Sequence, residues 1–111
     1  MPPNDSVRLR HMLDAGRQAI DFGLGRSRED LAGDRIRTLA IVKCIEMIGE
    51  AASRVTSDTR SQHQEIPWAD IVGMRNRLIH VYFEIDLDRV CDTVANDLPP
   101  LVANLGRMLL G

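Results

Sequence analysis

A single long run of helical periodicity constrains the fold of this chain more than any other feature of its sequence. From Asp34 to Val55, apolar side chains recur three and four positions apart, and the stripe contains Ile36, Leu39, Ala40, Ile45, Ile48, Ala52 and Val55. An α-helix rises about 1.5 Å per residue, so this run would extend roughly 33 Å, comparable to the width of a small domain. A chain of 111 residues does not supply apolar partners for such a helix on all sides. The run therefore predicts a helical protein that pairs with a second copy of itself.

The segment before this run also has the pattern of an amphipathic helix. It extends from Asn4 to Gly25, and its apolar positions near helical spacing are Leu9, Met12, Leu13, Ile20 and Leu24. Asn4, Asp5 and Ser6 are residue types that cap helix starts, and glycines end the pattern. We expect the arginines of this segment to form a solvated face, with RNA contact as the minor alternative.

Helix-start signals and a polar gap delimit the long run. Ser27 with Asp30 three residues later has the spacing of a capping box, and the element that follows is expected to continue to about Asp58. Gly33 is expected to break or bend its first turn. The stretch from Ser57 to Glu65 is poor in apolar residues, and this pattern predicts a loop.

The second half of the chain predicts two further helices. One is expected from Pro67 to about Phe83, with Pro67 as its first residue and Trp68 as its anchor. Asp86 is expected to cap the next helix. Pro99 and Pro100 must kink or interrupt that helix, because proline lacks the amide donor and disfavours a helical residue before it.

The composition agrees with helices packed on helices. Apolar residues make up 44% of the chain and aromatic residues only 4%, so the core must consist mainly of Leu, Ile, Val, Met and Ala. We therefore expect one domain covering residues 1–111 with an all-α fold. Its predicted architecture is an antiparallel bundle of four to five helices that forms a homodimer.

The charge of the chain excludes a broadly basic nucleic-acid-coating surface. The net charge is −2, so any contact with RNA must be local. Thirteen of the fourteen basic residues are arginine, and Lys43 is the only lysine. Arginine suits an RNA cleft or ion pairs between subunits, but a GC-rich genome explains the same bias.

The cysteines and histidines lack the spacing of a metal or redox motif. Cys44 and Cys91 lie far apart, and His11, His63 and His80 show no ligand spacing with them. We predict reduced, partly buried thiols, no metal site and no cofactor. No stretch resembles a signal peptide or a membrane span, so we expect a cytoplasmic protein without membrane contact.

One short apolar segment carries four polar side chains with usable chemistry. Arg75, Asn76, His80 and Tyr82 lie between Gly73 and Asp86, and polar groups brought near a small core need partners. Arginine holds phosphate oxygens, and histidine exchanges a proton near neutral pH. The pattern is compatible with cleavage of an RNA phosphodiester, in which the 2′-hydroxyl is the nucleophile. A core histidine and a surface arginine would give the same spacing by accident.

A regular helix would not bring the two central groups together. At about 100° per residue, Asn76 and His80 share one face, whereas Arg75 lies about 140° from His80. We expect the helix to loosen near its end so that the long arginine reaches across. On the preceding helix, Glu46 and Glu50 are four residues apart and face the same way. They are candidates to pair with Arg75 or Arg77, although solvent-exposed carboxylates without a special role are the alternative.

Two stretches of the chain resemble a known family. The segment Arg75-Asn76-Arg77-Leu78-Ile79-His80-Val81-Tyr82 resembles the motif of HepT-like toxins in the HEPN superfamily, namely arginine, four residues, histidine, any residue and tyrosine. The segment Ile48-Gly49-Glu50-Ala51 resembles a second stretch that these proteins carry on their preceding long helix. The resemblance covers nearly the whole chain in order and in spacing.

The resemblance implies a metal-independent endoribonuclease that acts as a homodimer with its site in the dimer cleft. It also implies a toxin whose antitoxin is an MNT-type nucleotidyltransferase that transfers AMP to the motif tyrosine. Arg75 and His80 would then be catalytic, Asn76 supporting and Tyr82 the modified residue. Glu50 and Arg77 are candidates for an interface or supporting role. The alternative is a non-catalytic HEPN module that binds a nucleotide or a partner.

Overall fold

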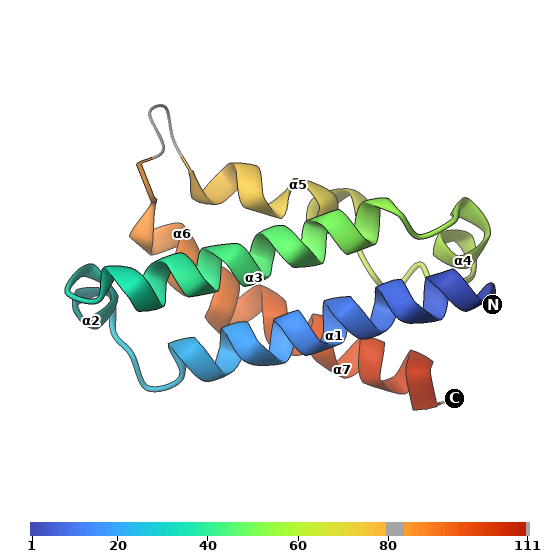
Figure 1. Cartoon of the computed structure of the whole chain (residues 1–111), viewed down its shortest axis with the longest axis horizontal. Coiled ribbons are helices and arrows are strands. Elements are labelled where there is room, and N and C mark those ends of the chain that lie inside the picture. Colours follow the sequence, from blue (N-terminus) through green and yellow to red (C-terminus); the bar gives the residue numbers. More distant parts are fainter. Residues whose placement is uncertain (80–83, 111) are drawn as a thin grey trace.

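Helices that alternate in direction form the fold. The computed structural model describes residues 1–79 and 84–110. Its long elements are α1 (Pro3–Gly23), α3 (Arg35–Ser53), α5 (Trp68–Leu78) and a continuous arm of α6 (Leu87–Asp92), the π-helical turn η2 (Thr93–Asp97) and α7 (Leu98–Leu110) (Figure 1). α3 packs on α1 and α5, and α1 also packs on α7. The described residues contain no β-strand, which confirms the expected all-α class.

The core is aliphatic and centres on α3. Fully buried large side chains come from α1, α3, α5, α6 and α7, and they include Leu9, Met12, Ile41, Ile45, Ile48, Leu78, Val90, Leu98 and Leu105. The apolar face of α3 is wide, as expected, but the predicted stripe was placed partly on the wrong side. Ile36 is 84% exposed and Leu39 44% exposed, whereas Ile41 and Val42 are buried. Apolar spacing alone does not distinguish these two sides of the helix, because both contain residues at helical intervals.

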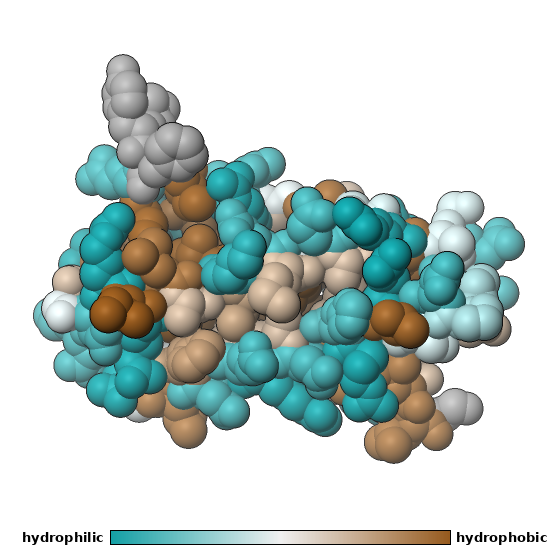
Figure 2. Space-filling model, viewed as in Figure 1, coloured by the Kyte–Doolittle hydropathy of each residue, from teal (hydrophilic) through white to brown (hydrophobic). Residues whose placement is uncertain are grey.

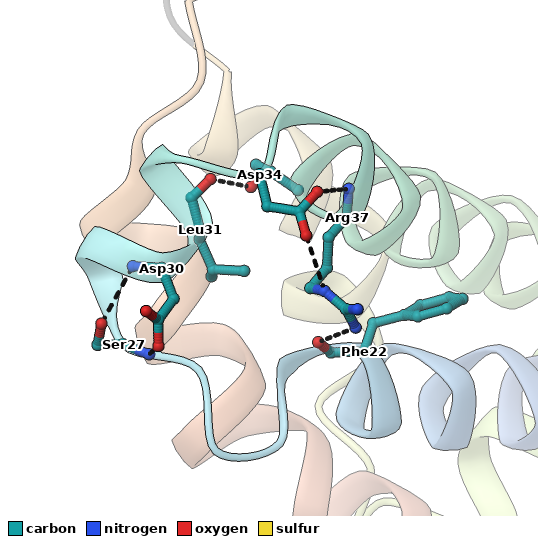
Figure 3. A network of polar contacts seen from close by, with 7 residues as sticks. Phe22, Ser27, Asp30, Leu31, Asp34 and Arg37 are labelled. Carbon is teal, nitrogen blue, oxygen red and sulfur yellow. Dashed lines mark hydrogen bonds and ion pairs between the residues drawn. The ribbon is translucent and has the colours of Figure 1, made fainter.

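A polar network makes the sharp connection between α1 and α3 (Figure 3). The hydroxyl of Ser27 accepts a hydrogen bond from the Asp30 amide at 3.1 Å, and the Asp30 carboxylate accepts one from the Ser27 amide at 2.9 Å. The predicted capping box is therefore confirmed, and it starts the short helix α2 (Arg28–Ala32). The chain breaks at Gly33, and Asp34 caps α3 by accepting from the Arg37 amide at 3.0 Å. Arg37 also donates to the Phe22 carbonyl at 3.1 Å, which ties the end of α1 to α3.

The stretch predicted as a loop contains a further helix, α4 (Ser57–Gln62). Polar contacts form it rather than apolar periodicity, which is why the sequence pattern did not indicate it. The guanidinium of Arg60 donates to the Ala52 carbonyl at 2.7 Å and to the Val55 carbonyl at 3.1 Å, so it ties α4 to the end of α3. The same guanidinium lies 5.8 Å from the centre of the Trp68 ring, a cation–π distance.

The start of α1 also differs from expectation. Asn4, Asp5 and Ser6 do not cap the helix, which begins at Pro3 without a side-chain cap. Asp5 lies inside the first turn with 1% of its surface exposed. Its carboxylate accepts hydrogen bonds from the Thr56 amide at 3.1 Å, the Thr56 hydroxyl at 2.6 Å and the Thr59 hydroxyl at 2.6 Å. The residue therefore joins α1 to the α3–α4 connection.

The helix that carries the motif is shorter than predicted. α5 ends at Leu78, and Pro67 is its N-cap rather than its first residue. Ile79 has an extended backbone and forms an antiparallel bridge with Ile85, while the Asp86 amide donates to the Leu78 carbonyl at 2.7 Å. Leu78 is fully buried, so the core fixes the point at which the chain leaves the helix. The helix therefore ends before the point at which it was expected to loosen, and residues 80–83 lie outside the described ranges.

The final arm accommodates two prolines without a break. Asp86 caps α6 by accepting from the Arg89 amide at 3.1 Å, as predicted. Pro99 and Pro100 are the second and third residues of α7 and directly follow the π-helical turn. The turn before them widens into η2, whose Thr93 carbonyl accepts from the Leu98 amide five residues on. The expected interruption therefore takes the form of a π-helical turn.

Two further findings concern the thiols and membranes. Cys44 is buried and Cys91 is partly buried, and both are free, as predicted. Burial raises the pKa of each thiol. Within the described part of the chain, no helix has both the length and the apolar character needed to cross a membrane.

Gly49 sets the distance between α3 and α5. A Cβ atom built at this position would lie 3.3 Å from the Val72 carbonyl oxygen and 3.5 Å from that of Ile71. The backbone of α5 therefore approaches α3 so closely at this point that a side chain here would press against backbone atoms. This glycine belongs to the segment 48–51 that resembles the family pattern.

Substituting Gly49→Val is expected to lower the free energy of unfolding by about 1–3 kcal/mol, because overpacking against backbone atoms forces the helices apart. Denaturant unfolding measures this change. Gly106→Val in α7 is the matched control, since nothing lies within 4 Å of a Cβ atom there. Equal losses in the two variants would show that helix propensity, and not the close approach, is responsible.

Candidate active site

A polar groove lies along the outer side of α3 between α1 and α5. It encloses about 870 Å³, within the range of about 300–1,000 Å³ usual for ligand sites. Its charged and polar lining residues are Arg8, His11, Asp14, Gln18, Lys43, Glu46, Glu50, Ser53, Arg54, Arg75 and Asn76. On this face, Figure 2 shows pale, weakly apolar residues over α3 between rows of hydrophilic side chains. We call this surface the central groove.

Arg75 reaches the central groove from α5 and is held there by an acidic residue. Its Nε atom forms an ion pair with Oε1 of Glu46 on α3. The side chain of Arg75 is 41% exposed and that of Glu46 is 28% exposed, so the pair is only partly shielded from water. Lys43 lies on the other side of the same carboxylate, with its Nζ 3.8 Å from Oε2 of Glu46. Of the two carboxylates considered from the sequence, Glu46 is therefore the one that meets the motif arginine.

The two residues after Arg75 point in different directions. Asn76 is exposed and lines the central groove with Arg75. Arg77 lies elsewhere and lines a smaller pocket of about 200 Å³ that is formed with residues of α6 and η2. Its guanidinium donates to the Asp70 carbonyl of its own helix at 2.5 Å. Arg77 and Arg75 thus lie on different surfaces of the molecule.

Glu50 also lines the central groove, and among the described residues it forms an ion pair with Arg54. Its carboxylate lies 3.6 Å from Nη2 of Arg54, one turn further along α3, and its side chain is 74% exposed. An exposed pair of this kind contributes little to stability. The position is compatible with an interface role.

His80 and Tyr82 lie outside the described residues. The structure does describe both anchors of the segment that carries them, Ile79 and Ile85, which form a bridge to each other. Because α5 has already ended at Leu78, the angle of about 140° between Arg75 and His80 on a regular helix does not apply. Helical periodicity therefore does not argue against a joint role for Arg75 and His80.

The groove contains basic residues from α1 that sequence reasoning did not single out for a site. Arg8 and His11 line its far side from Arg75. A signal was present, because Arg8, His11, Ala15 and Gln18 follow one another at spacings of three and four residues and so share a face of α1. Arg8, Lys43, Arg54 and Arg75 give the groove four cationic side chains against three acidic ones in a chain whose net charge is negative.

Within residues 1–79 and 84–110, no three His, Cys, Asp or Glu side chains converge as a metal site would require. The groups that the groove brings together are instead guanidinium, amide and carboxylate. Of these groups, the guanidinium and the amide can donate hydrogen bonds to an anion such as a phosphate, whereas a carboxylate only accepts them.

These observations define a small all-α protein in which an arginine of α5 lines a polar groove between helices. The chain belongs to the ribonuclease HepT-like family, whose model matches residues 12–108. The resemblance to HepT-like proteins of the HEPN superfamily is thereby confirmed.

Relatives of known name agree with this assignment. The chain is 34% identical over 101 residues to "Putative RNase TTE0752" of Caldanaerobacter subterraneus subsp. tengcongensis, covering 91% of this chain and 90% of the relative. It is 38% identical over 73 residues to "Probable ribonuclease HepT" of Thermococcus cleftensis, covering 66% of each. It is 31% identical over 102 residues to "Putative RNase MJ1216" of Methanocaldococcus jannaschii, covering 91% and 84%. No solved structure matches the chain significantly.

Proposed function

We propose that this protein is a metal-independent endoribonuclease. The observation that carries the proposal is the position of Arg75, whose guanidinium lines a groove large enough for a ligand and is held there by Glu46. Membership of the ribonuclease HepT-like family supports RNA as the substrate. The arginine fork matches the geometry of phosphate oxygens.

The proposed reaction is an internal transesterification. Neutral His80 takes the proton from the ribose 2′-hydroxyl, and the 2′-oxygen attacks the phosphorus. The bond to the 5′-oxygen breaks, and that oxygen takes the proton from the His80 imidazolium, so the products end in a 2′,3′-cyclic phosphate and a 5′-hydroxyl and His80 is neutral again. Arg75 stabilises the negative charge that develops on the phosphorus oxygens, and Asn76 orients the phosphate, a water molecule or His80.

Cleavage of a single-stranded RNA in EDTA tests this function. We expect the wild-type protein to cut the RNA, and we expect His80→Ala to lower the rate by at least about 10²-fold, the usual effect of losing a general base. Mass spectrometry of the fragments should find cyclic phosphate ends. Equal cleavage by the two proteins would contradict the mechanism, and no cleavage by either would contradict the function.

A homodimer is part of the proposal. Three exposed apolar side chains follow one another along the outer side of α3, namely Ile36, Leu39 and Met47, and Val72 of α5 lies beside the groove. Large apolar side chains gathered on one helix face are typical of a protein interface. Pairing through this face would bring the Arg75 residues of two copies to one cleft. Light scattering should find a dimer for the wild type and a monomer for Leu39→Glu.

The biological role that we propose is that of a cytoplasmic toxin with an MNT-type nucleotidyltransferase as antitoxin. The proposal rests on the family, and AMP transfer to Tyr82 would place a phosphate near Arg75 and compete with RNA by bulk and charge. Co-expression with a nucleotidyltransferase from a neighbouring gene should add AMP mass to the wild type but not to Tyr82→Phe. An unmodified, fully neutralised protein would contradict this route of control.

A non-catalytic module that binds a nucleotide or a partner is the second candidate. The observation in its favour is charge, because the chain has a net charge of −2 and the groove contains three carboxylates beside its cations. Calorimetry that detects nucleotide binding by a protein without RNA turnover would favour it over the ribonuclease.

A further inference from the structure

The contact between Glu46 and Arg75 lies in register with the closest approach of two helices. Gly49 of α3 meets the Val72 carbonyl of α5. Glu46 is three residues before Gly49, and Arg75 is three residues after Val72. Because α3 and α5 run antiparallel, a step back along one helix matches a step forward along the other (Figure 1). Both contacts therefore lie on the same pair of helix faces, about one turn apart.

From this geometry we infer that Glu46 is a positioning residue, which acts on RNA through the orientation of Arg75. The inference rests on the proposed function and adds to it a residue to which no role has been assigned. Glu46 is anchored well, because its helical neighbours Ile45 and Ile48 are fully buried and the packing of α3 on α5 is fixed by Gly49. A carboxylate held in this way restricts a side chain that would otherwise sample many rotamers.

The atoms used in the contact leave the arginine able to bind phosphate. The hydrogen bond to Glu46 is donated by Nε and not by the two terminal nitrogens of Arg75. Those terminal nitrogens form an edge of the guanidinium that can donate two parallel hydrogen bonds to a phosphate. Lys43, close to the second oxygen of Glu46, reduces the negative charge that an approaching phosphate would meet.

An opposite role for Glu46 is also conceivable on chemical grounds and gives opposite results. A carboxylate bound to an arginine can compete with substrate phosphate for it. Removing a competitor would lower KM and raise the rate at low RNA concentration. Removing a positioning group would instead lower kcat, because the guanidinium would have to be ordered during the reaction.

Steady-state cleavage of a short single-stranded RNA by Glu46→Ala and Glu46→Gln separates these roles. We expect Glu46→Ala to lower kcat by about 10- to 100-fold with KM changed less than about threefold. Glu46→Gln keeps an oxygen acceptor for Nε and should recover most of that loss. Asp58→Ala, which removes an exposed carboxylate of α4 that does not line the central groove, is the control and should leave kcat unchanged.

A structural readout makes the inference testable without cleavage. The Nε–H signal of Arg75 in a proton–nitrogen NMR spectrum, assigned through its loss in Arg75→Lys, should exchange slowly in the wild type and in Glu46→Gln and rapidly in Glu46→Ala. An unchanged signal in Glu46→Ala would overturn the inference, as would an unchanged kcat or a lower KM with faster cleavage. A wild-type protein that cuts no RNA would overturn the proposed function. In that case the exchange rate of the Arg75 Nε–H signal would by itself show whether Glu46 positions Arg75.

Discussion

Arg75→Ala is expected to lower kcat for RNA cleavage by about 10²- to 10³-fold, the effect usual for losing one group that stabilises transition-state charge. The loss has a second physical cause in this protein. Without the guanidinium, the carboxylate of Glu46 remains in the central groove with Lys43 as its remaining partner, and it would repel an approaching phosphate. The rate is measured on single-stranded RNA in EDTA.

Two comparison variants make this prediction specific. Arg77→Ala removes an equal charge from the same helix turn, but Arg77 lines the pocket beside α6 and η2, so its rate should stay within about threefold of wild type. Arg75→Ala combined with Glu46→Ala should recover part of the rate if repulsion by the stranded carboxylate contributes. Equal losses in Arg75→Ala and Arg77→Ala would mean that overall charge, and not the groove, governs RNA cleavage.

Asp5→Ala is expected to lower the free energy of unfolding by about 2–4 kcal/mol. The reason is that buried hydrogen-bond donors would lose their acceptor and would still be shielded from water, which is unfavourable. The donors are the Thr56 amide and the hydroxyls of Thr56 and Thr59, which all bind the Asp5 carboxylate. Urea unfolding near neutral pH measures the loss. Asp14→Ala removes an exposed carboxylate from the same helix and should have little effect, so an equal loss there would contradict the prediction.

The same carboxylate predicts a dependence of stability on pH. Burial raises the pKa of Asp5, but hydrogen bonds from the Thr56 hydroxyl, the Thr59 hydroxyl and the Thr56 amide together outweigh burial, and the pKa falls below its ordinary value of 3.8. A lowered pKa in the folded state means that Asp5 contributes stability above about pH 4 and loses that contribution as the pH falls through the folded value. Asp5→Asn should unfold with a weaker dependence on pH below about 4. An identical acid profile would contradict a role for this carboxylate.

Signals that act over a few residues were sufficient to predict much of the fold. The capping box at Ser27, the cap at Asp86 and the break at Gly33 all depend on chemistry within one turn of helix, and all are present. The helix α4 was missed because its contacts involve Asp5 and the carbonyls at the end of α3, which are distant in sequence or carry no pattern. The side of α3 that is buried was misjudged in part for a related reason, since Ile36 and Ile41 are equally apolar.

The candidate site divides in the same way. The motif beginning at Arg75 can be identified from the sequence, because it requires only residue types at fixed spacing. The sequence does not show that Glu46, and not Glu50, is the partner of Arg75, because both carboxylates face the same way on one helix. Nor does the sequence separate Arg75 from Arg77, which face different pockets.

Residue order alone was therefore enough to predict an all-helical chain, the caps that start α2 and α6, and the family to which the chain belongs, because capping, helical spacing and motif spacing are local properties. The packing of α5 on α3 decided which carboxylate holds the motif arginine and where α5 ends. Both outcomes depend on how closely the backbones of α3 and α5 approach each other at Gly49. Residues far apart in the chain set this distance together.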